Sequence, residues 1–197
     1  MPTRTRARPL SLDDRRAAIV DVVIPLILEH GSDITTRQIA EAADVAEGTI
    51  FRAFGDKESI IDAAVERFFD PEPIRRMLEA IDPGLPLRDK VHDLLFHLQA
   101  RTTGVIQILG ALGPRKRPRR PDSGDDFVDL ISSVLASDSG ILRVDPIEIA
   151  RYLRLIAFAS SVGPLAAAHP FTIDQLTDLV VSGITTTTRE QRTDDAA

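Results

Sequence analysis

The sequence predicts an all-α fold, with a small helical domain at the N-terminus and a larger helical domain after it. Apolar residues recur at helical spacing through most of the 197 residues. Capping pairs that open helices recur as well, at Thr35 with Gln38 and at Thr172 with Gln175. No segment alternates apolar and polar residues for long enough to indicate a sheet. These observations together favour helices throughout.

The chain is expected to divide at Asp70-Pro71-Glu72-Pro73, because the two prolines interrupt any helix that reaches them. We expect a disordered basic arm over residues 1–10, a first helical domain over 11–70 and a second over 71–190. Residues 113–124, rich in Pro, Arg and Gly, are expected to form a mobile loop, and 191–197 a polar tail.

Each domain has its own set of expected helices. The first domain should hold helices over residues 12–30, 36–44, 47–54 and 57–69. Gly31 ends the first of these, and Asp56 caps the last. The second domain should hold helices over residues 74–81, 87–103, 125–136, 146–168 and 172–189.

Composition excludes several kinds of protein. The chain has no cysteine, which excludes disulfides, thiolate metal sites and cysteine nucleophiles. Apolar runs fall short of the ~20 residues of a membrane span, and the N-terminus lacks the pattern of a signal peptide. The histidines form no metal-binding pattern, and no catalytic motif or acid/base pair is evident. We therefore expect a cytoplasmic protein with no membrane contact, no catalytic residue, no metal and no cofactor.

The charge distribution matters more than its sum. A formal net charge of −6 counts against a nucleic-acid partner. Basic residues nevertheless crowd the N-terminus, at Arg4, Arg6, Arg8, Arg15 and Arg16. A second basic run, from Arg115 to Arg120, is interpreted as a solvated loop.

The most informative segment is ITTRQIAEAADVAEGTIFRAFGDK, from Ile34 to Lys57. The segment is predicted to form two short helices joined by a turn too tight for antiparallel packing, so the helices should cross steeply. Ala40 has a small side chain at the position where the two helices would approach most closely. Ile39, Ile50 and their neighbours can form a shared core. The second helix then presents Ala46, Glu47, Thr49, Arg52 and Ala53 to solvent, with side chains small enough at its start to enter a major groove.

This segment resembles the DNA-binding motif of the TetR family of repressors. The matching positions are Thr36, Ile39, Ala40, Ala43, Val45, Gly48, Thr49, Ile50, Phe54 and Lys57. Three residues depart from the motif. Asp44 replaces the turn glycine, Ala46 replaces a capping serine, and Phe51 replaces a tyrosine that by resemblance would bond a phosphate. Asp tolerates the left-handed conformation of the turn, whereas a lost cap costs about 1 kcal/mol.

The resemblance implies a helix-turn-helix domain over residues 11–70 and a ligand-binding and dimerisation domain over 71–190. It implies a palindromic double-stranded DNA operator, a small, moderately hydrophobic effector and a homodimer formed through about 146–189. The residues expected to contact DNA are Thr36, Arg37, Ala46, Glu47, Gly48, Thr49, Phe51, Arg52 and Lys57. Among them Thr36, Arg37 and Lys57 are expected to hold phosphates, and Thr49 and Arg52 to approach base edges or nearby phosphates.

Two further expectations concern the second domain. Side chains expected to line an effector pocket are Phe69, Phe96, Gln99, Phe127, Tyr152 and Phe158. The apolar faces expected to meet in the dimer comprise Ile149, Leu153, Ile156, Ala157, Ser160 and Ser161 with Leu176, Leu179, Val180, Gly183 and Ile184. We reason that a single subunit cannot cover both faces.

Two alternatives to a ligand-responsive regulator stay open. A helical adaptor whose helix-turn-helix no longer binds DNA would explain the acidic charge and the missing serine and tyrosine. A helical-bundle enzyme would need a pair of titratable residues in a pocket, and the sequence indicates none.

Overall fold

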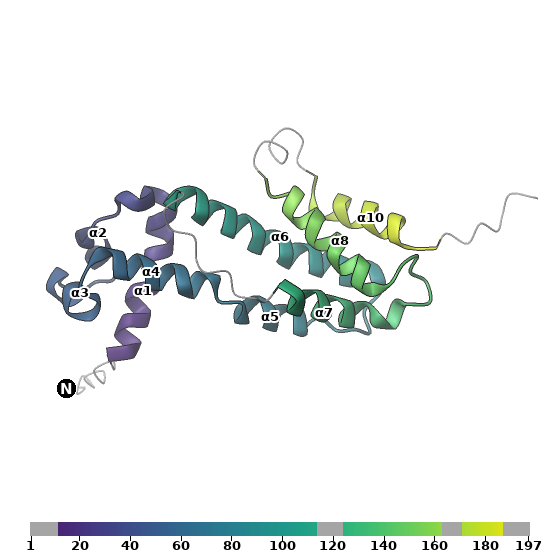
Figure 1. Cartoon of the computed structure of the whole chain (residues 1–197), viewed down its shortest axis with the longest axis horizontal. Helices are drawn as coiled ribbons and strands as arrows, with labels where there is room; N and C mark the ends of the chain where they lie inside the picture. The colour runs from purple at the N-terminus through teal and green to yellow at the C-terminus, as the bar shows by residue number, and fades with distance from the viewer. Residues whose placement is uncertain (1–11, 114–123, 163–170, 187–197) are drawn as a thin grey trace, which may run out of the picture. The chain divides into compact units, whose positions relative to one another are not determined.

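The computed structural model describes residues 12–113, 124–162 and 171–186 (Figure 1). All regular elements in these ranges are helical, apart from an isolated antiparallel bridge between Leu142 and Thr185. The all-α fold expected from the sequence is therefore confirmed. The expected arm, the centre of the expected loop, its basic run and the tail lie outside the described residues.

The described chain forms two compact units, and one helix contributes to both. Residues 12–70 and 107–113 form the N-terminal unit. Residues 71–106, 124–162 and 171–186 form the C-terminal unit. The shared helix is α6 (Leu87–Leu112), whose last residues pack in the N-terminal unit.

The N-terminal unit contains α1 (Leu12–His30), α2 (Thr36–Ala42), α3 (Glu47–Phe54) and α4 (Lys57–Phe69) (Figure 1). A 3-10 turn, η1 (Gly31–Asp33), follows α1. Val23, Ile27 and Ile39 are fully buried in its core, together with Ile108 from the end of α6. Asp56 caps α4 as expected, its side chain accepting a hydrogen bond from the Ser59 amide at 2.7 Å.

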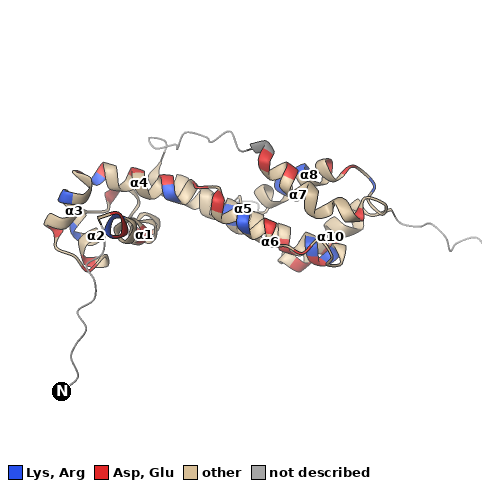
Figure 2. Ribbon diagram, turned by 90° about the horizontal axis from the view of Figure 1, so that it is seen from below, with Lys and Arg blue, Asp and Glu red and all other residues tan. Residues whose placement is uncertain are grey.

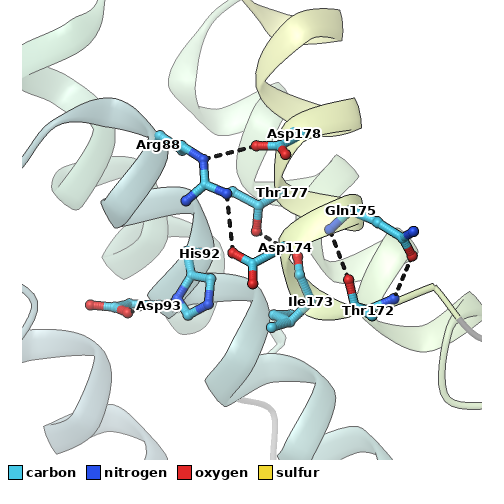
Figure 3. Close-up of polar contacts among 9 residues, drawn as sticks. All are labelled: Arg88, His92, Asp93, Thr172, Ile173, Asp174, Gln175, Thr177 and Asp178. Carbon is cyan, nitrogen blue, oxygen red and sulfur yellow. Dashed lines mark hydrogen bonds and ion pairs between the residues drawn. The ribbon is translucent and has the colours of Figure 1, made fainter.

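The C-terminal unit contains α5 (Glu72–Glu79), the first part of α6, α7 (Gly124–Leu135), α8 (Pro146–Ala159) and α10 (Ile173–Ile184). A 3-10 turn, η2 (Ala136–Asp138), follows α7. Arg88 on α6 holds α10, donating to Asp178 at 2.8 Å and to Asp174 at 3.1 Å (Figure 3). These hydrogen bonds, with Asp178 first, raise the pKa of the Arg88 guanidinium above its ordinary value.

Helix ends in this unit differ from those expected. Helix α6 continues to Leu112 instead of ending near residue 103, because Ile108 and Leu112 bury apolar side chains in the N-terminal unit. Helix α8 ends at Ala159, well before residue 168. Helix α10 ends at Ile184, where Thr185 turns to an extended conformation. Tertiary packing, which local sequence does not encode, decides such ends.

The expectation about uncovered apolar faces is wrong for most of the residues named. The buried members are Ile149, Leu153, Ala157, Leu176, Val180 and Ile184, which lie in the core of the C-terminal unit. A single subunit therefore covers them. Leu179 is different, because 59% of it is exposed.

Candidate DNA-binding surface

Helices α2 and α3 are joined by a turn whose geometry the sequence anticipates. Thr35 and Gln38 form the expected capping box at the start of α2, the Gln38 amide donating to the Thr35 hydroxyl at 3.2 Å. In the turn Asp44 takes a left-handed conformation, with φ of 52°. The Val45 amide then donates to the Ala40 carbonyl at 3.0 Å. An aspartate thus fits where the motif has glycine.

The start of α3 has no side-chain cap. Ala46 precedes the helix in an extended conformation, and its side chain accepts no hydrogen bond. Its carbonyl accepts one from the Thr49 amide at 2.7 Å. The start of α3 therefore has no capping oxygen, and the acidic side chain in its first turn is that of Glu47.

One face of α3 is open to solvent, and it carries the residues expected to reach DNA. Glu47, Gly48 and Arg52 are exposed, and Thr49 is partly buried. Arg52 lies along the helix, its Nε donating to the Gly48 carbonyl at 3.1 Å. Phe51 is 49% exposed, so a large part of its ring lies outside the core formed around Ile50.

Helices α2 and α3 carry both acidic and basic residues (Figure 2). The Thr36 hydroxyl donates to Glu47 at 2.5 Å, which ties the start of α2 to the start of α3. Arg37 donates to Glu41 at 2.9 Å, and this hydrogen bond raises the pKa of the Arg37 guanidinium above its ordinary value. The contact between Arg37 and Glu41 could have been predicted from the sequence, because residues four apart on one helix are neighbours. Only the fold brings Thr36 to Glu47.

Two other basic residues lie against the backbone of neighbouring segments. Lys57, at the start of α4, donates to the Ser32 carbonyl at 3.0 Å. Arg16 on α1 donates to the Ala53 carbonyl at 2.7 Å, and its guanidinium stacks over the Phe54 ring at 4.6 Å. Sequence reasoning placed Arg16 in a basic cluster, whereas the structure shows that it fastens α1 to α3.

The C-terminal unit contains a cavity of about 430 Å³. Its lining residues are Ile74, Leu98, Arg101, Thr102, Phe127, Arg151, Arg154, Leu155, Ala157 and Phe158. Of the side chains expected in a pocket, Phe127 and Phe158 line this cavity. Phe96, Gln99 and Tyr152 do not, and Phe69 belongs to the N-terminal unit. Apolar residues recur too often in amphipathic helices for sequence alone to select the lining.

Other kinds of site find no support in the described ranges. The described residues contain no cluster of three or more side chains suited to hold a metal ion. None of the helices in these ranges is long and apolar enough to cross a membrane.

Comparisons with known proteins agree with this geometry. Residues 19–64 match the family described as "Bacterial regulatory proteins, tetR family". Over 97 residues the chain is 31% identical to YhgD of Bacillus subtilis, an HTH-type transcriptional regulator, covering 48% of this chain and 50% of YhgD. It is 32% identical over 82 residues to the HTH-type transcriptional repressor KstR2 of Rhodococcus jostii, covering 41% of this chain and 40% of KstR2. The matched segments thus span half the length of these curated relatives or less.

The fold extends the likeness beyond the matched segments. AibR, solved in complex with isovaleryl coenzyme A and operator DNA, superposes on this chain with a TM-score of 0.51 at 19% sequence identity. The superposition covers 86% of this chain and 97% of AibR. At that level of identity the likeness concerns the fold alone. The matched N-terminal segment, the α2–α3 geometry and this shared fold make the chain similar to the TetR family of helix-turn-helix transcriptional regulators, and the family match itself covers residues 19–64.

Proposed function

We propose that this regulator is a repressor that binds a palindromic operator and is released by a small, moderately hydrophobic effector. The observation that carries the proposal is the exposed face of α3, held across α2 by a tight turn and uncapped at its start. A helix presented in this way suits the major groove. KstR2 is named a repressor, which supports the direction of regulation.

The side chains divide into two roles. Thr36, Arg37 and Lys57 lie at or near the starts of α2 and α4, where helix N-termini favour phosphates. Thr49 and Arg52 lie on the solvent side of α3, from which an arginine pairs with guanine and a threonine methyl meets thymine. Glu47 suits a cytosine, whose amino group donates to a carboxylate.

A homodimer follows from the small number of base pairs that one helix reads. Apolar side chains remain exposed on the helices expected to pair: Leu155 is 61% exposed on α8, and Leu179 is 59% exposed on α10. Two copies related by a two-fold axis would cover these residues with the same face from each side. The half-sites would then lie ~34–36 Å apart, or a multiple of that distance.

The cavity in the C-terminal unit supports an effector. Its volume of about 430 Å³ lies in the range usual for small-molecule sites. Helix α6 lines it with Leu98 and Thr102, and the same helix buries Ile108 in the core of the N-terminal unit. An effector that binds one conformation of α6 more tightly than another would change the population of the DNA-binding state.

A gel-shift assay with the DNA upstream of the protein's own gene tests the function. We expect salt-sensitive binding that prefers this DNA over a shuffled duplex.

Lys57→Ala should weaken binding to every duplex and lower the salt slope by about one unit. Arg52→Ala should relax the preference at particular base pairs, by ~1–3 kcal/mol. If both variants lose affinity equally for the two duplexes, the division between phosphate-binding and base-reading residues is wrong. If the wild-type protein shows no selective binding, the alternative function of a helical adaptor is favoured.

A further inference from the structure

We propose that the cavity of the C-terminal unit binds an amphipathic organic anion, a carboxylate attached to an apolar chain or ring. The inference rests on the proposed function, in which this cavity holds the effector. It specifies the chemistry of that effector from the kinds of side chain that line the cavity and from where they lie.

The apolar part of the lining fits a hydrocarbon body. Ile74, Leu98 and Ala157 are buried and come from α5, α6 and α8. The rings of Phe127 and Phe158 add aromatic surface from α7 and α8. Contact with such surface removes apolar ligand area from water, which favours binding.

The polar part of the lining is basic. Arg101 on α6 and both Arg151 and Arg154 on α8 contribute guanidinium groups. None of the described residues that line the cavity is acidic. A guanidinium offers two parallel N–H donors that match a carboxylate, and it keeps its charge at any physiological pH. An amine with the same apolar body would meet three like charges.

The three arginines should not contribute equally. The side chain of Arg151 is 61% exposed, so solvent weakens its attraction for a ligand. Arg101 and Arg154 are partly buried, where charge-assisted hydrogen bonds are stronger. We therefore assign the carboxylate to Arg101 and Arg154.

The decisive experiment is calorimetric titration of the full-length protein, without DNA, with decanoate, 1-decanol and decylamine below their aggregation limits. We expect decanoate to bind at least tenfold more tightly than decanol, and decylamine most weakly. Arg101→Gln and Arg154→Gln should each weaken decanoate binding by roughly tenfold, the value of one charge-assisted hydrogen bond, and leave decanol within about twofold. Arg151→Gln should have a smaller effect.

Two further variants make the result specific. Arg76→Gln removes an arginine of the same unit that does not line the cavity, and it should change neither affinity. Phe158→Ser should weaken decanoate and decanol alike. Equal affinity for decanoate and decanol, or arginine variants that weaken both ligands equally, would overturn the inference.

Repeating the titration in the presence of operator DNA separates this inference from the proposed function. If decanoate binds through the arginines and does not alter DNA affinity, the proposal that an effector controls DNA binding is wrong. The inference that the cavity binds an organic anion would then still hold. DNA affinity that responds to decanol and not to decanoate would leave effector control standing and refute the anionic ligand.

Discussion

The buried ammonium of Lys90 shows how single residues hold the C-terminal unit together. Lys90 is 1% exposed, and it donates to the Pro83 carbonyl at 2.9 Å and to the Ser137 hydroxyl at 2.8 Å. Its third partner is the carboxylate of Asp138. All three donors of the ammonium are therefore used, joining the turn before α6 to η2.

Removing one partner of the ion pair between Lys90 and Asp138 should lower the free energy of unfolding more than removing both partners. Asp138→Asn leaves the buried ammonium without its counter-charge and should lower the free energy of unfolding by about 3 kcal/mol, measured by urea denaturation. The double variant Lys90→Met, Asp138→Asn should recover part of that loss. If the double variant is less stable than Asp138→Asn, the pair contributes net stability of its own and this argument is wrong.

On the proposed DNA-binding surface, the ion pair between Arg37 and Glu41 should oppose DNA binding. Their side chains are 80% and 65% exposed, so the pair is weak and a phosphate competes for the guanidinium. Glu41→Gln removes a negative charge next to the backbone of DNA and should raise affinity for all duplexes by about twofold to tenfold. Glu79→Gln, on α5, is the control and should leave affinity unchanged. Unchanged affinity in Glu41→Gln would mean that Arg37 does not approach a phosphate.

At the scale of elements, Gly31 sets how the end of α1 meets α6. Gly31 has φ of 62°, and a Cβ there would lie 2.8 Å from the Ala111 carbonyl oxygen. A side chain would therefore clash with backbone and strain a left-handed residue. Helix α6 packs closely at this point because the residue is glycine.

An alanine should consequently have opposite effects at two glycines of the N-terminal unit. Gly31→Ala should destabilise the unit by about 2 kcal/mol, from the left-handed strain and the contact with Ala111. Gly110→Ala, in α6 with nothing within 4 Å of the added Cβ, should stabilise by about 0.5–1 kcal/mol. Thermal unfolding of both variants checks this. A loss at both positions would indicate that the tight contact at Gly31 does not explain its effect.

Some helix boundaries depend on neighbouring residues and could be predicted from the sequence, whereas others depend on distant residues and could not. The cap at Thr35, the left-handed Asp44 and the start of α8 at Pro146 depend on residues within a few positions, so the sequence contains the necessary information. The end of α6 depends on a core some 80 residues away in the chain at Ile27 and Ile34, which no local pattern reports.

For the whole molecule, the proposed dimer is the feature most directly tied to the proposed DNA affinity. Leu179→Glu places a charge on an exposed position of α10 and should give a folded monomer with little specific DNA affinity, as measured by sedimentation and gel-shift. Leu28→Glu, at a 46% exposed position of α1, should remain dimeric. Leu153→Glu is unsuitable as a test, because Leu153 is buried in the subunit core. A dimeric Leu179→Glu would place the interface elsewhere.

The two candidate sites differ in how far the sequence could predict them, because one lies in a contiguous segment and the other is assembled from several helices. The α2–α3 motif occupies one contiguous segment, so spacing identified the exposed Ala46, Glu47 and Arg52. It also named Thr49 and Ala53, which are partly buried. It did not name Phe51, which is 49% exposed. The cavity draws on α5, α6, α7 and α8, and its basic lining emerges only when Arg101 is brought near Arg151 and Arg154. The resemblance to a family gave no help there, since it covers the N-terminal segment.

Fluorescence anisotropy tests most directly whether this chain reads a specific DNA sequence through α3. The wild-type protein is titrated with its own upstream duplex and with a shuffled duplex of equal composition, over a series of salt concentrations. We expect affinity for the upstream duplex to be at least ~10³-fold higher than for the shuffled duplex, and affinity for both to fall steeply as salt rises. Equal affinity for the two duplexes at every salt concentration would contradict this expectation.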